Sequence, residues 1–243
     1  MLVLGIETST PAASVCLGTD KGVVASAAIG PGLPELARAH GAFVAPAIRY
    51  CLDTAGVDAS AVNGVAVSLG PGLFTGMRVG ITTAQAFAHA RSLPMVGLAS
   101  LDLLAFPHRH VRRQLCSVID ARRGELFWAT YKSVHGGVQR LGEFRRGRPD
   151  VLAAELEATT EDTLCVGEGA VQHRGLLESA GADVAEGSVH PDARALVALA
   201  MGRFIREETR RPEELTPIYL RQADAQIGWA KRGALHGGTA GPP

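Results

Sequence analysis

The amino-acid sequence predicts an α/β protein of two lobes, because the same order of secondary structure occurs twice along the chain. Short apolar runs of strand length alternate with longer stretches of helical periodicity. In each half, three strands joined by short turns are followed by helix, strand, helix and strand. The chain has 243 residues, 47% of them hydrophobic, which is enough to bury a core in each lobe. The expected fold is therefore a duplicated βββαβαβ arrangement.

The first half begins with a predicted meander of three strands. The expected strands are residues 2–6, 13–17, 23–28, 62–69 and 93–98, and the expected helices are residues 35–52, 75–91 and 101–105. Tight turns between the first three strands indicate antiparallel pairing. Pro46 lies inside the first helix, where we expect a kink. We assign residues 1–105 to the first lobe.

The second half repeats the order of elements, although not the residues themselves. The expected strands are residues 115–119, 125–131, 138–144 and 164–166 with a weak strand at Val184, and the expected helices are residues 150–157, 170–180 and 193–210. We assign residues 106–225 to the second lobe. Residues 226–243 are rich in Gly and Pro, so we expect a disordered tail.

The charge balance argues against a nucleic-acid-binding protein that acts alone. Lys and Arg total 24, and Asp and Glu also total 24, whereas binding to phosphate backbones draws on clustered positive charge. Arginine clusters do occur at residues 109–113, 122–123 and 145–148. Each is most simply a solvated face.

The cysteines and the apolar segments narrow the possible class of protein further. Cys16, Cys51, Cys116 and Cys165 form no C-x-x-C pair, so we expect reduced, buried thiols and no zinc or redox site. The opening MLVLGIETST is a short apolar run without a basic leader, which indicates a strand. No window of about 20 residues is apolar enough to span a membrane. We expect a cytoplasmic protein that binds no membrane.

The order of elements resembles that of actin-like ATPases, which bind nucleotide between two lobes. This resemblance implies a fold and does not by itself imply ATP hydrolysis. In active members, an acidic residue after the first strand is followed by glycine and a hydroxyl residue. Here Glu7 is followed by Thr8 and Ser9, whose hydroxyls could bind an anion or could simply stabilise the turn.

Two other features of a nucleotide site are also incomplete. The matching turn of the second lobe begins at Asp120 and carries Arg122 and Arg123 where an ATPase needs glycines. These guanidinium groups could pair with an anion or with acidic residues of a partner. Gly167 and Gly169 resemble a glycine-rich loop that packs on adenine. The sequence therefore predicts a vestigial nucleotide or anion site, with ATP as its candidate nucleotide, at Thr8, Ser9, Asp120, Arg122, Gly167 and Gly169.

The stretch from Ser68 to Ala90 joins a glycine-rich loop to a helix. The spacing of Gly70, Gly72 and Gly76 matches neither a dinucleotide fingerprint nor a phosphate-binding P-loop. Thr75 is the expected N-cap, and Arg78 in the first turn makes weak anion binding feasible.

Along the same helix, small residues recur at every fourth position. Gly76, Gly80, Ala84 and Ala88 form a stripe on one side of the helix and permit close packing of another element. The stripe is either a contact within the lobe or a subunit interface. We predict a partner interface at Gly72, Phe74, Thr75, Gly76, Arg78, Gly80, Ala84 and Ala88, with the helix at residues 35–52 beside it.

The sequence lacks the motifs of common nucleophilic and zinc enzymes. There is no G-x-S-x-G and no H-E-x-x-H. Histidines such as His40, His89, His108 and His110 show no ligand spacing with carboxylates. We therefore predict no catalytic residue and no metal site in this chain.

Four segments in the expected order resemble one bacterial family over about residues 1–225. These are VLGIETSTPAASVCL, GPGLFTGMRVGITTAQAFA, VIDARRGELFWATY and PIYLR. They are similar to the TsaB (YeaZ) family of tRNA threonylcarbamoyladenosine biosynthesis proteins. The resemblance implies a two-lobed actin-like fold and a non-catalytic subunit without a cofactor of its own.

The resemblance also implies partners. TsaB-like proteins pair through first-lobe helices with the related catalytic subunit TsaD, and the ATPase TsaE joins them. The complex transfers a threonylcarbamoyl group from its adenylate to N6 of an adenosine beside the tRNA anticodon. The resemblance further implies that tRNA is reached through the complex and that this chain alone could form a homodimer. Nucleotide binding, stoichiometry and contact between the arginines and tRNA stay open.

One position supports the TsaB-like assignment over a TsaD-like one. In the TsaD-like paralogues, an H-x-x-x-H pair binds a metal, because residues at i and i+4 share a helix face. By register, Ser100 and Leu104 occupy these positions here, and leucine cannot ligate a metal. The alternatives are a glycoprotease-like metallopeptidase and a nucleotide-binding enzyme of the actin fold.

Overall fold

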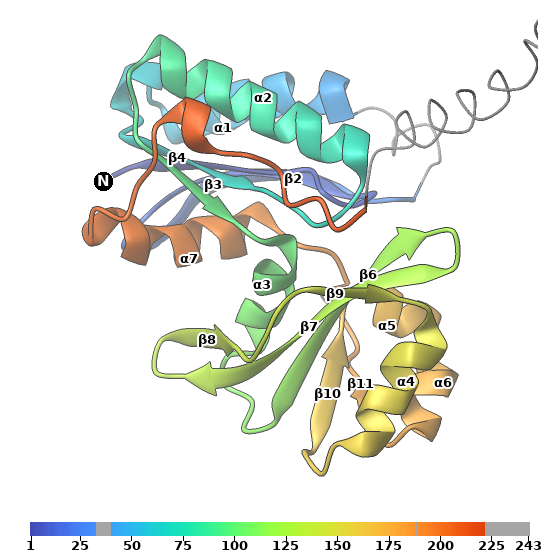
Figure 1. Ribbon diagram of the computed structural model, residues 1–243. Coiled ribbons are helices and arrows are strands. Elements are labelled where there is room, and N and C mark those ends of the chain that lie inside the picture. The colour runs from blue at the N-terminus through green and yellow to red at the C-terminus, as the bar shows by residue number, and fades with distance from the viewer. Residues whose placement is uncertain (33–39, 188, 222–243) are drawn as a thin grey trace, which may run out of the picture.

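The computed structural model describes residues 1–32, 40–187 and 189–221, which form two lobes that each contain one mixed sheet (Figure 1). The start of the helix predicted at residues 35–52 and the predicted tail at 226–243 lie outside the described residues. The first sheet consists of β1 (Val3–Glu7), β2 (Ala13–Thr19), β3 (Gly22–Ile29), β4 (Gly64–Ser68) and β5 (Met95–Leu98). Its helices are α1 (His40–Ala55), α2 (Phe74–Ala90) and α3 (Ser100–Ala105).

The second sheet has the same topology as the first. Its strands are β6 (Gln114–Arg122), β7 (Glu125–Val134), β8 (Gly137–Arg140), β9 (Arg145–Gly147), β10 (Thr163–Val166) and β11 (Asp183–Val184). The first sheet has the order β3-β2-β1-β4-β5, and the second has the order β8-β7-β6-β10-β11, with β9 also paired to β7. In both, the central strand pairs antiparallel on one side and parallel on the other. The predicted duplication is therefore confirmed.

Several boundaries differ from the sequence prediction for local reasons. The strand predicted at residues 138–144 is wrong as one element, because β8 ends at Arg140 and β9 begins at Arg145. The helix predicted at 170–180 is interrupted at His173 and becomes α5 (Glu168–Gln172) and α6 (Arg174–Ser179). The last helix, α7 (Ala193–Ile205), ends earlier than predicted, because Glu207 adopts a left-handed φ of 58°. The remaining helix, α4 (Pro149–Ala158), agrees with the prediction within two residues.

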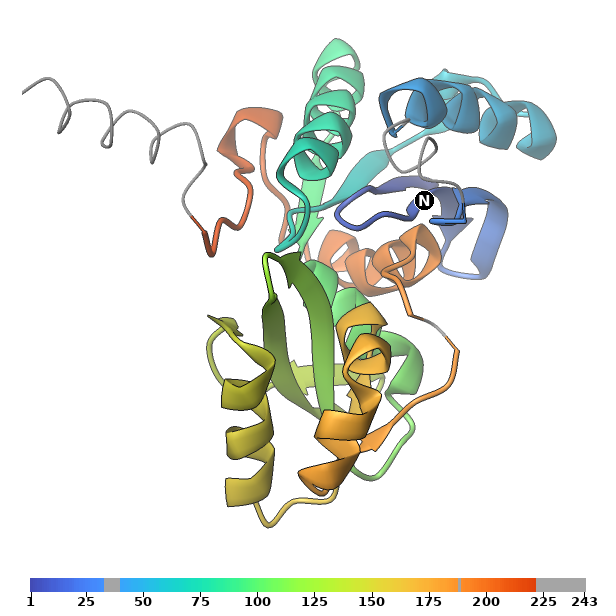
Figure 2. The ribbon, with the colours of Figure 1, turned by 90° about the vertical axis from the view of Figure 1, so that its right-hand side faces the viewer.

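Helices cover both faces of the first sheet. α1 and α2 lie on one face and α7 lies on the other (Figures 1 and 2). Apolar residues of α7 share a core with Val3, Cys16 and Ala66 of the first sheet. After α7, the backbone of Arg210 pairs with Met95 of β5. The C-terminal part of the chain thus returns to the first lobe, which the division between residues 105 and 106 did not predict.

Close approach of α7 depends on glycines in two strands. A Cβ atom at Gly5 of β1 would lie 2.6 Å from a methyl group of Val197, and one at Gly18 of β2 would lie 2.8 Å from the other. Ordinary contacts of a Cβ atom are longer than this. The two glycines therefore let α7 lie closer to the sheet than larger residues would allow.

α3 makes the reciprocal contact with the second lobe. Leu101, Leu104 and Ala105 are buried in one core with Leu115 and Ile119 of β6. On the same helix, Asp102 accepts a hydrogen bond from the hydroxyl of Tyr131 at 2.8 Å. Each lobe therefore packs the helix that ends its own repeat against the other lobe.

Within the described ranges, no helix combines the length and the apolar character needed to cross a membrane.

The packing of α3 gives a direct test of the coupling between lobes. Replacement of Leu104 by Ala should lower the free energy of unfolding by about 2–5 kcal/mol, because a buried leucine leaves a cavity. Urea unfolding followed by circular dichroism measures this change. The matched control is Leu141→Ala at an exposed leucine, which should cost less than about 0.5 kcal/mol. Equal losses of unfolding free energy in the two variants would contradict the burial of α3 in the core of the second lobe.

Candidate functional site

The small-residue stripe of α2 faces the core of its own lobe. A Cβ atom at Gly76 would overlap the carbonyl oxygen of Thr8, and one at Gly80 would overlap its hydroxyl. Ala84 and Ala88 are fully buried in the first core. Of the two alternatives that the sequence left open, the structure shows the contact within the lobe. These four residues offer no exposed surface to a partner, and a bulky replacement there would disturb the core.

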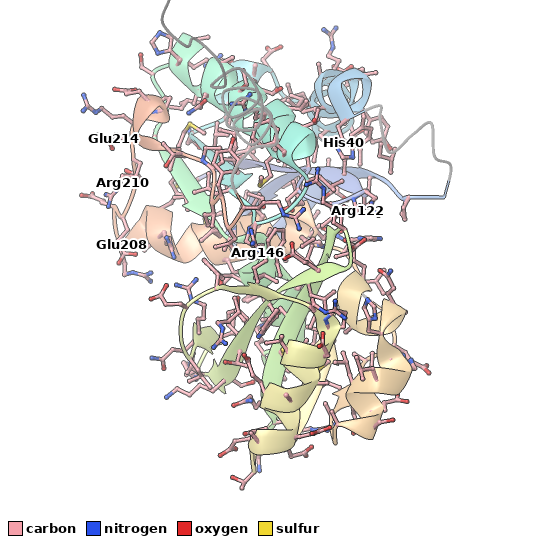
Figure 3. The ribbon with its side chains drawn as sticks, turned by 45° about the vertical axis from the view of Figure 1, so that its right-hand side comes forward. His40, Arg122, Arg146, Glu208, Arg210 and Glu214 are labelled. Carbon is pink, nitrogen blue, oxygen red and sulfur yellow. The ribbon has the colours of Figure 1, made fainter. Side chains whose placement is uncertain are left out.

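The same packing covers the first turn, where part of an anion site was predicted. Thr8 and Ser9 are buried, and the Thr8 hydroxyl donates a hydrogen bond to the carbonyl oxygen of Gly76 at 2.8 Å. The carbonyl oxygen of Ser9 accepts the N–H of Leu73 at 2.7 Å. His40 at the start of α1 (Figure 3) lies with its Nε2 3.3 Å from the carbonyl oxygen of Pro11. The hydroxyls of Thr8 and Ser9 are therefore not accessible to a ligand from solvent.

Glu7 at the end of β1 is a fully buried carboxylic acid. One of its oxygens accepts the N–H of Ser9, and among the described residues its other oxygen has no hydrogen-bond partner. Burial raises the pKa of Glu7 above its usual value of 4.5, and interactions with Ser68 and Ser9 oppose the rise. Glu7 therefore holds a proton more readily than an exposed glutamate does.

The second-lobe turn is built differently. Asp120 accepts the backbone N–H of Arg122 at 2.7 Å and its guanidinium at 3.0 Å. Arg122 and Arg123 have φ values of 61° and 58°, in the left-handed region that favours glycine. The arginines that stand where an ATPase needs glycines therefore adopt a glycine-like backbone path.

Gly167 and Gly169 contact other parts of the protein. A Cβ atom at Gly167 would lie 2.9 Å from Leu104, and its φ is 109°. A Cβ atom at Gly169 would lie 2.9 Å from Val118 of β6. These glycines let α5 approach β6 and α3. The structure therefore does not bring them into one open site with Thr8 and Ser9.

The positions compared with metal ligands serve packing. The Ser100 hydroxyl donates to the carbonyl oxygen of Pro71 at 2.5 Å, and Leu104 lies in the second-lobe core. Among the described residues, no three His, Cys, Asp or Glu side chains are placed to hold a metal ion. Cys16, Cys51, Cys116 and Cys165 are all free and buried.

α2 begins one residue earlier than predicted and without the expected cap. Its N-cap residue is Leu73, so the prediction that Thr75 caps the helix is wrong. Leu73 is extended, and its carbonyl oxygen accepts the N–H of Met77. No described side chain caps this helix start, and the loop before it is held by the hydrogen bond from the Leu73 N–H to the carbonyl oxygen of Ser9.

An open cleft of 540 Å³ lies between the lobes at this helix start. It is lined by residues 72–75 with Met77 and Arg78, by residues 121–123 with Phe127, and by residues 218–221. The structure thus brings Gly72, Phe74, Thr75 and Arg78 of the predicted interface together with Arg122 of the predicted anion site. Sequence reasoning missed Tyr219 and Arg221, although PIYLR was one of the recognised segments.

A second hollow lies on the outside of the first lobe. It is an apolar groove of 510 Å³ between β3 and α1. Its principal lining residues are Ala27, Ile29, Ala42, Phe43, Pro46 and Tyr50. Tyr50 is 56% exposed. The groove shares no lining residue with the interlobe cleft.

Buried Glu7 makes stability depend on pH in a defined direction. Because its pKa is raised in the folded state, the folded protein binds the proton more tightly, and the free energy of unfolding falls as pH rises above 4.5. Glu7→Gln removes this loss, so the variant should gain stability relative to the parent between about pH 4 and pH 7. Urea unfolding of both proteins across this range tests the prediction. A difference that does not change with pH would contradict it.

Comparison with known proteins agrees with this architecture. The family model for tRNA N6-adenosine threonylcarbamoyltransferase (TsaD) matches residues 25–229. The Escherichia coli tRNA threonylcarbamoyladenosine biosynthesis protein TsaB is 30% identical over 95% of this chain and 98% of its own length. A tRNA N6-adenosine threonylcarbamoyltransferase from Desulforapulum autotrophicum is 34% identical over 42% of this chain and 34% of its own.

A solved structure, YeaZ from Pseudomonas aeruginosa, superposes with a TM-score of 0.75 at 28% identity. The superposition covers 90% of this chain and 99% of that one. The family resemblance and the two-lobed α/β fold expected from the sequence are therefore confirmed. This chain belongs to the TsaB (YeaZ) family of tRNA threonylcarbamoyladenosine biosynthesis proteins.

Proposed function

We propose that this chain is a non-catalytic subunit that activates a TsaD-like threonylcarbamoyltransferase by binding to it. The proposal is supported by membership in a family that contributes to threonylcarbamoyladenosine synthesis. It is also supported by Ser100 and Leu104, the two positions compared with metal ligands, which make packing contacts here. The reaction is transfer of a threonylcarbamoyl group from its adenylate to N6 of an adenosine beside the tRNA anticodon.

The apolar groove between β3 and α1 is the observation that carries this proposal. Val23 and Val24 of β3 are 52% and 46% exposed, and β3 is the edge strand of its sheet. Among the described residues, no strand pairs with the outer side of β3. Exposed apolar surface next to such an edge is typical of a protein interface. We place the catalytic subunit on this face, which retains α1 from the predicted interface and replaces the buried stripe of α2.

The remaining members of the assembly follow from the same proposal. A TsaE-like ATPase joins the pair, and tRNA is engaged by the complex as a whole. The subunit needs no cofactor of its own. In the absence of the catalytic partner, the groove of one copy can bind the same face of a second copy, which gives a homodimer.

The alternative enzyme functions lack a comparable site. A nucleotide-binding enzyme of the actin fold would use the first turn, which α2 covers through Thr8 and Leu73. A metallopeptidase would use Ser100 and Leu104, which are packed against other residues. Neither alternative accounts for the exposed apolar groove between β3 and α1.

Reconstitution tests the proposed role. TsaD-like and TsaE-like proteins from the same organism should modify tRNA with threonylcarbamoyl-adenylate only when this chain is added. Formation of N6-threonylcarbamoyladenosine is measured by mass spectrometry of digested tRNA. Full modification without this chain, or transfer by this chain alone, would refute the role of an activating subunit.

A pair of glutamate substitutions on α1 tests the docking face. Tyr50→Glu places a charge in the groove and should weaken binding to the TsaD-like subunit at least about tenfold, because burial of an unpaired charge is unfavourable. Ala45→Glu is the matched control, since Ala45 is exposed on the same helix but does not line the groove. Binding is measured by calorimetry. Equal binding by both variants would show that the interface does not lie on this groove.

A further inference from the structure

A largely buried carboxylate lies where the two lobes meet. Asp102 is on α3, the helix of the first repeat that packs against the second lobe (Figure 1). Its side chain is 23% exposed, and its neighbours Leu101 and Leu103 are buried. Residues 99–113 contain no other acidic residue. A carboxylate at a mostly apolar junction needs a physical reason, because taking its charge out of water is unfavourable.

Groups from three other elements act on this carboxylate. Its Oδ1 accepts a hydrogen bond from the hydroxyl of Tyr131 on β7 at 2.8 Å. The same oxygen lies 3.9 Å from a guanidinium nitrogen of Arg140 on β8. Arg203 of α7 and the backbone of Ala99 also interact with it. Asp102 therefore connects α3 and α7, the two helices that cross between the lobes, to the hairpin of β7 and β8.

The two partners in the hairpin are held in place by the second lobe. Tyr131 is 1% exposed, and burial raises the pKa of its phenol, so the hydroxyl stays protonated and acts as the donor. The guanidinium of Arg140 lies 3.8 Å from the ring centroid of Phe144, and its Nε donates to the carbonyl oxygen of Gly142 at 2.9 Å. A turn of one lobe against the other would therefore separate both partners from Asp102.

Stability alone does not explain the carboxylate. Burial raises the pKa of Asp102 above its usual value of 3.8, although Tyr131, Arg140 and Arg203 oppose the rise. The folded protein then binds this proton more tightly than the unfolded chain does, so the free energy of unfolding that Asp102 contributes falls as pH rises above 3.8. At neutral pH the unfavourable burial of the charge thus outweighs the attraction to its partners.

The polar contacts add direction to this junction. The apolar contacts of Leu101 and Leu104 hold the lobes together, but burial of apolar surface is non-directional and tolerates small changes of angle. A hydrogen bond, in contrast, weakens steeply when its geometry is disturbed. Buried polar groups can in this way select one arrangement without adding stability. Tyr131 and Arg140 both face Asp102 only while α3 keeps its position on the hairpin.

From this arrangement we propose that Asp102 is a positioning residue that locks the two lobes at one angle. The lock consists of the carboxylate of Asp102, the hydroxyl of Tyr131 and the guanidinium of Arg140, with Arg203 of α7 acting on the same carboxylate. The chain then moves as one rigid body, and the cleft at the start of α2 keeps a fixed width. The inference goes beyond the proposed function, because it concerns motion within this chain and needs no partner.

A double substitution separates the lock from stability. Asp102→Leu together with Tyr131→Phe removes both partners of the hydrogen bond and replaces them with apolar side chains of similar size. Such a replacement is close to neutral or stabilising, so the unfolding equilibrium constant at pH 7 should stay within about threefold of the parent's or be smaller. The lobes of this variant should nevertheless take a wider range of angles, because the directional contact is lost.

The motion is measured as a distribution of distances between two spin labels on the full-length chain. Arg49→Cys on α1 and Glu157→Cys on α4 carry the labels, since both positions are exposed and the four native cysteines are buried. Pulsed electron paramagnetic resonance should give one narrow distribution for the parent and about twice that width for the double variant, as hinge motion would. Urea unfolding of the same proteins gives their stability.

Three single variants identify the groups responsible. Tyr131→Phe leaves Asp102 without its donor, so the unfolding equilibrium constant should rise about tenfold and the distribution should widen. Asp102→Asn keeps an acceptor for the Tyr131 hydroxyl and should keep the narrow distribution. Asp58→Ala, at an exposed carboxylate of the first lobe that makes no capping hydrogen bond, is the control and should match the parent in both measurements.

A wider distribution with stability retained in the double variant supports the lock. The proposal is overturned if the double variant keeps the narrow distribution of the parent, or if the parent's own distribution is equally wide. It is also overturned if the double variant is less stable than Tyr131→Phe or does not fold, because Asp102 would then act through stability. None of these measurements involves another subunit, so the proposed function can hold even where the lock fails.

Discussion

The reciprocal packing of α3 and α7 holds the two lobes in one arrangement. Leu104 of α3 is buried in the core of the second lobe, while Val197 of α7 contacts Gly5 and Gly18 of the first sheet. Burial of these apolar side chains is possible only when the lobes are in contact. The chain therefore crosses between lobes twice, and every interlobe feature, including the cleft at the start of α2, depends on this packing.

The start of α2 determines which interlobe space is open. Glycines at positions 76 and 80 bring the helix onto Thr8, and Leu73 bonds to Ser9, so the first turn is covered. The same helix start places Phe74 and Arg78 on the other side of the loop, opposite Arg122. The first turn, where the sequence predicted part of an anion site, is thus covered, and a different surface at the start of α2 is open. This arrangement depends on the small residues at positions 76 and 80.

The two hollows at the surface differ in chemistry. The groove beside Tyr50 is apolar and lies next to β3, which among the described residues pairs on one side only, and such a face suits a protein. The cleft at the start of α2 instead contains the stacked rings of Phe74 and Tyr219 beside arginine side chains. The groove is formed within one lobe, whereas the cleft depends on how the two lobes meet.

The sequence by itself determined the order of elements, the duplicated topology and the family, because hydrophobic periodicity and short motifs are local properties. The tertiary structure decided three things that depend on contacts between distant residues. Gly80 and Ala84 face inward, although the same stripe would suit an interface. α7 returns to the first lobe, and Tyr219 meets Phe74 across the length of the chain. Small side chains permit close packing without specifying the partner, so only the folded chain shows which element approaches.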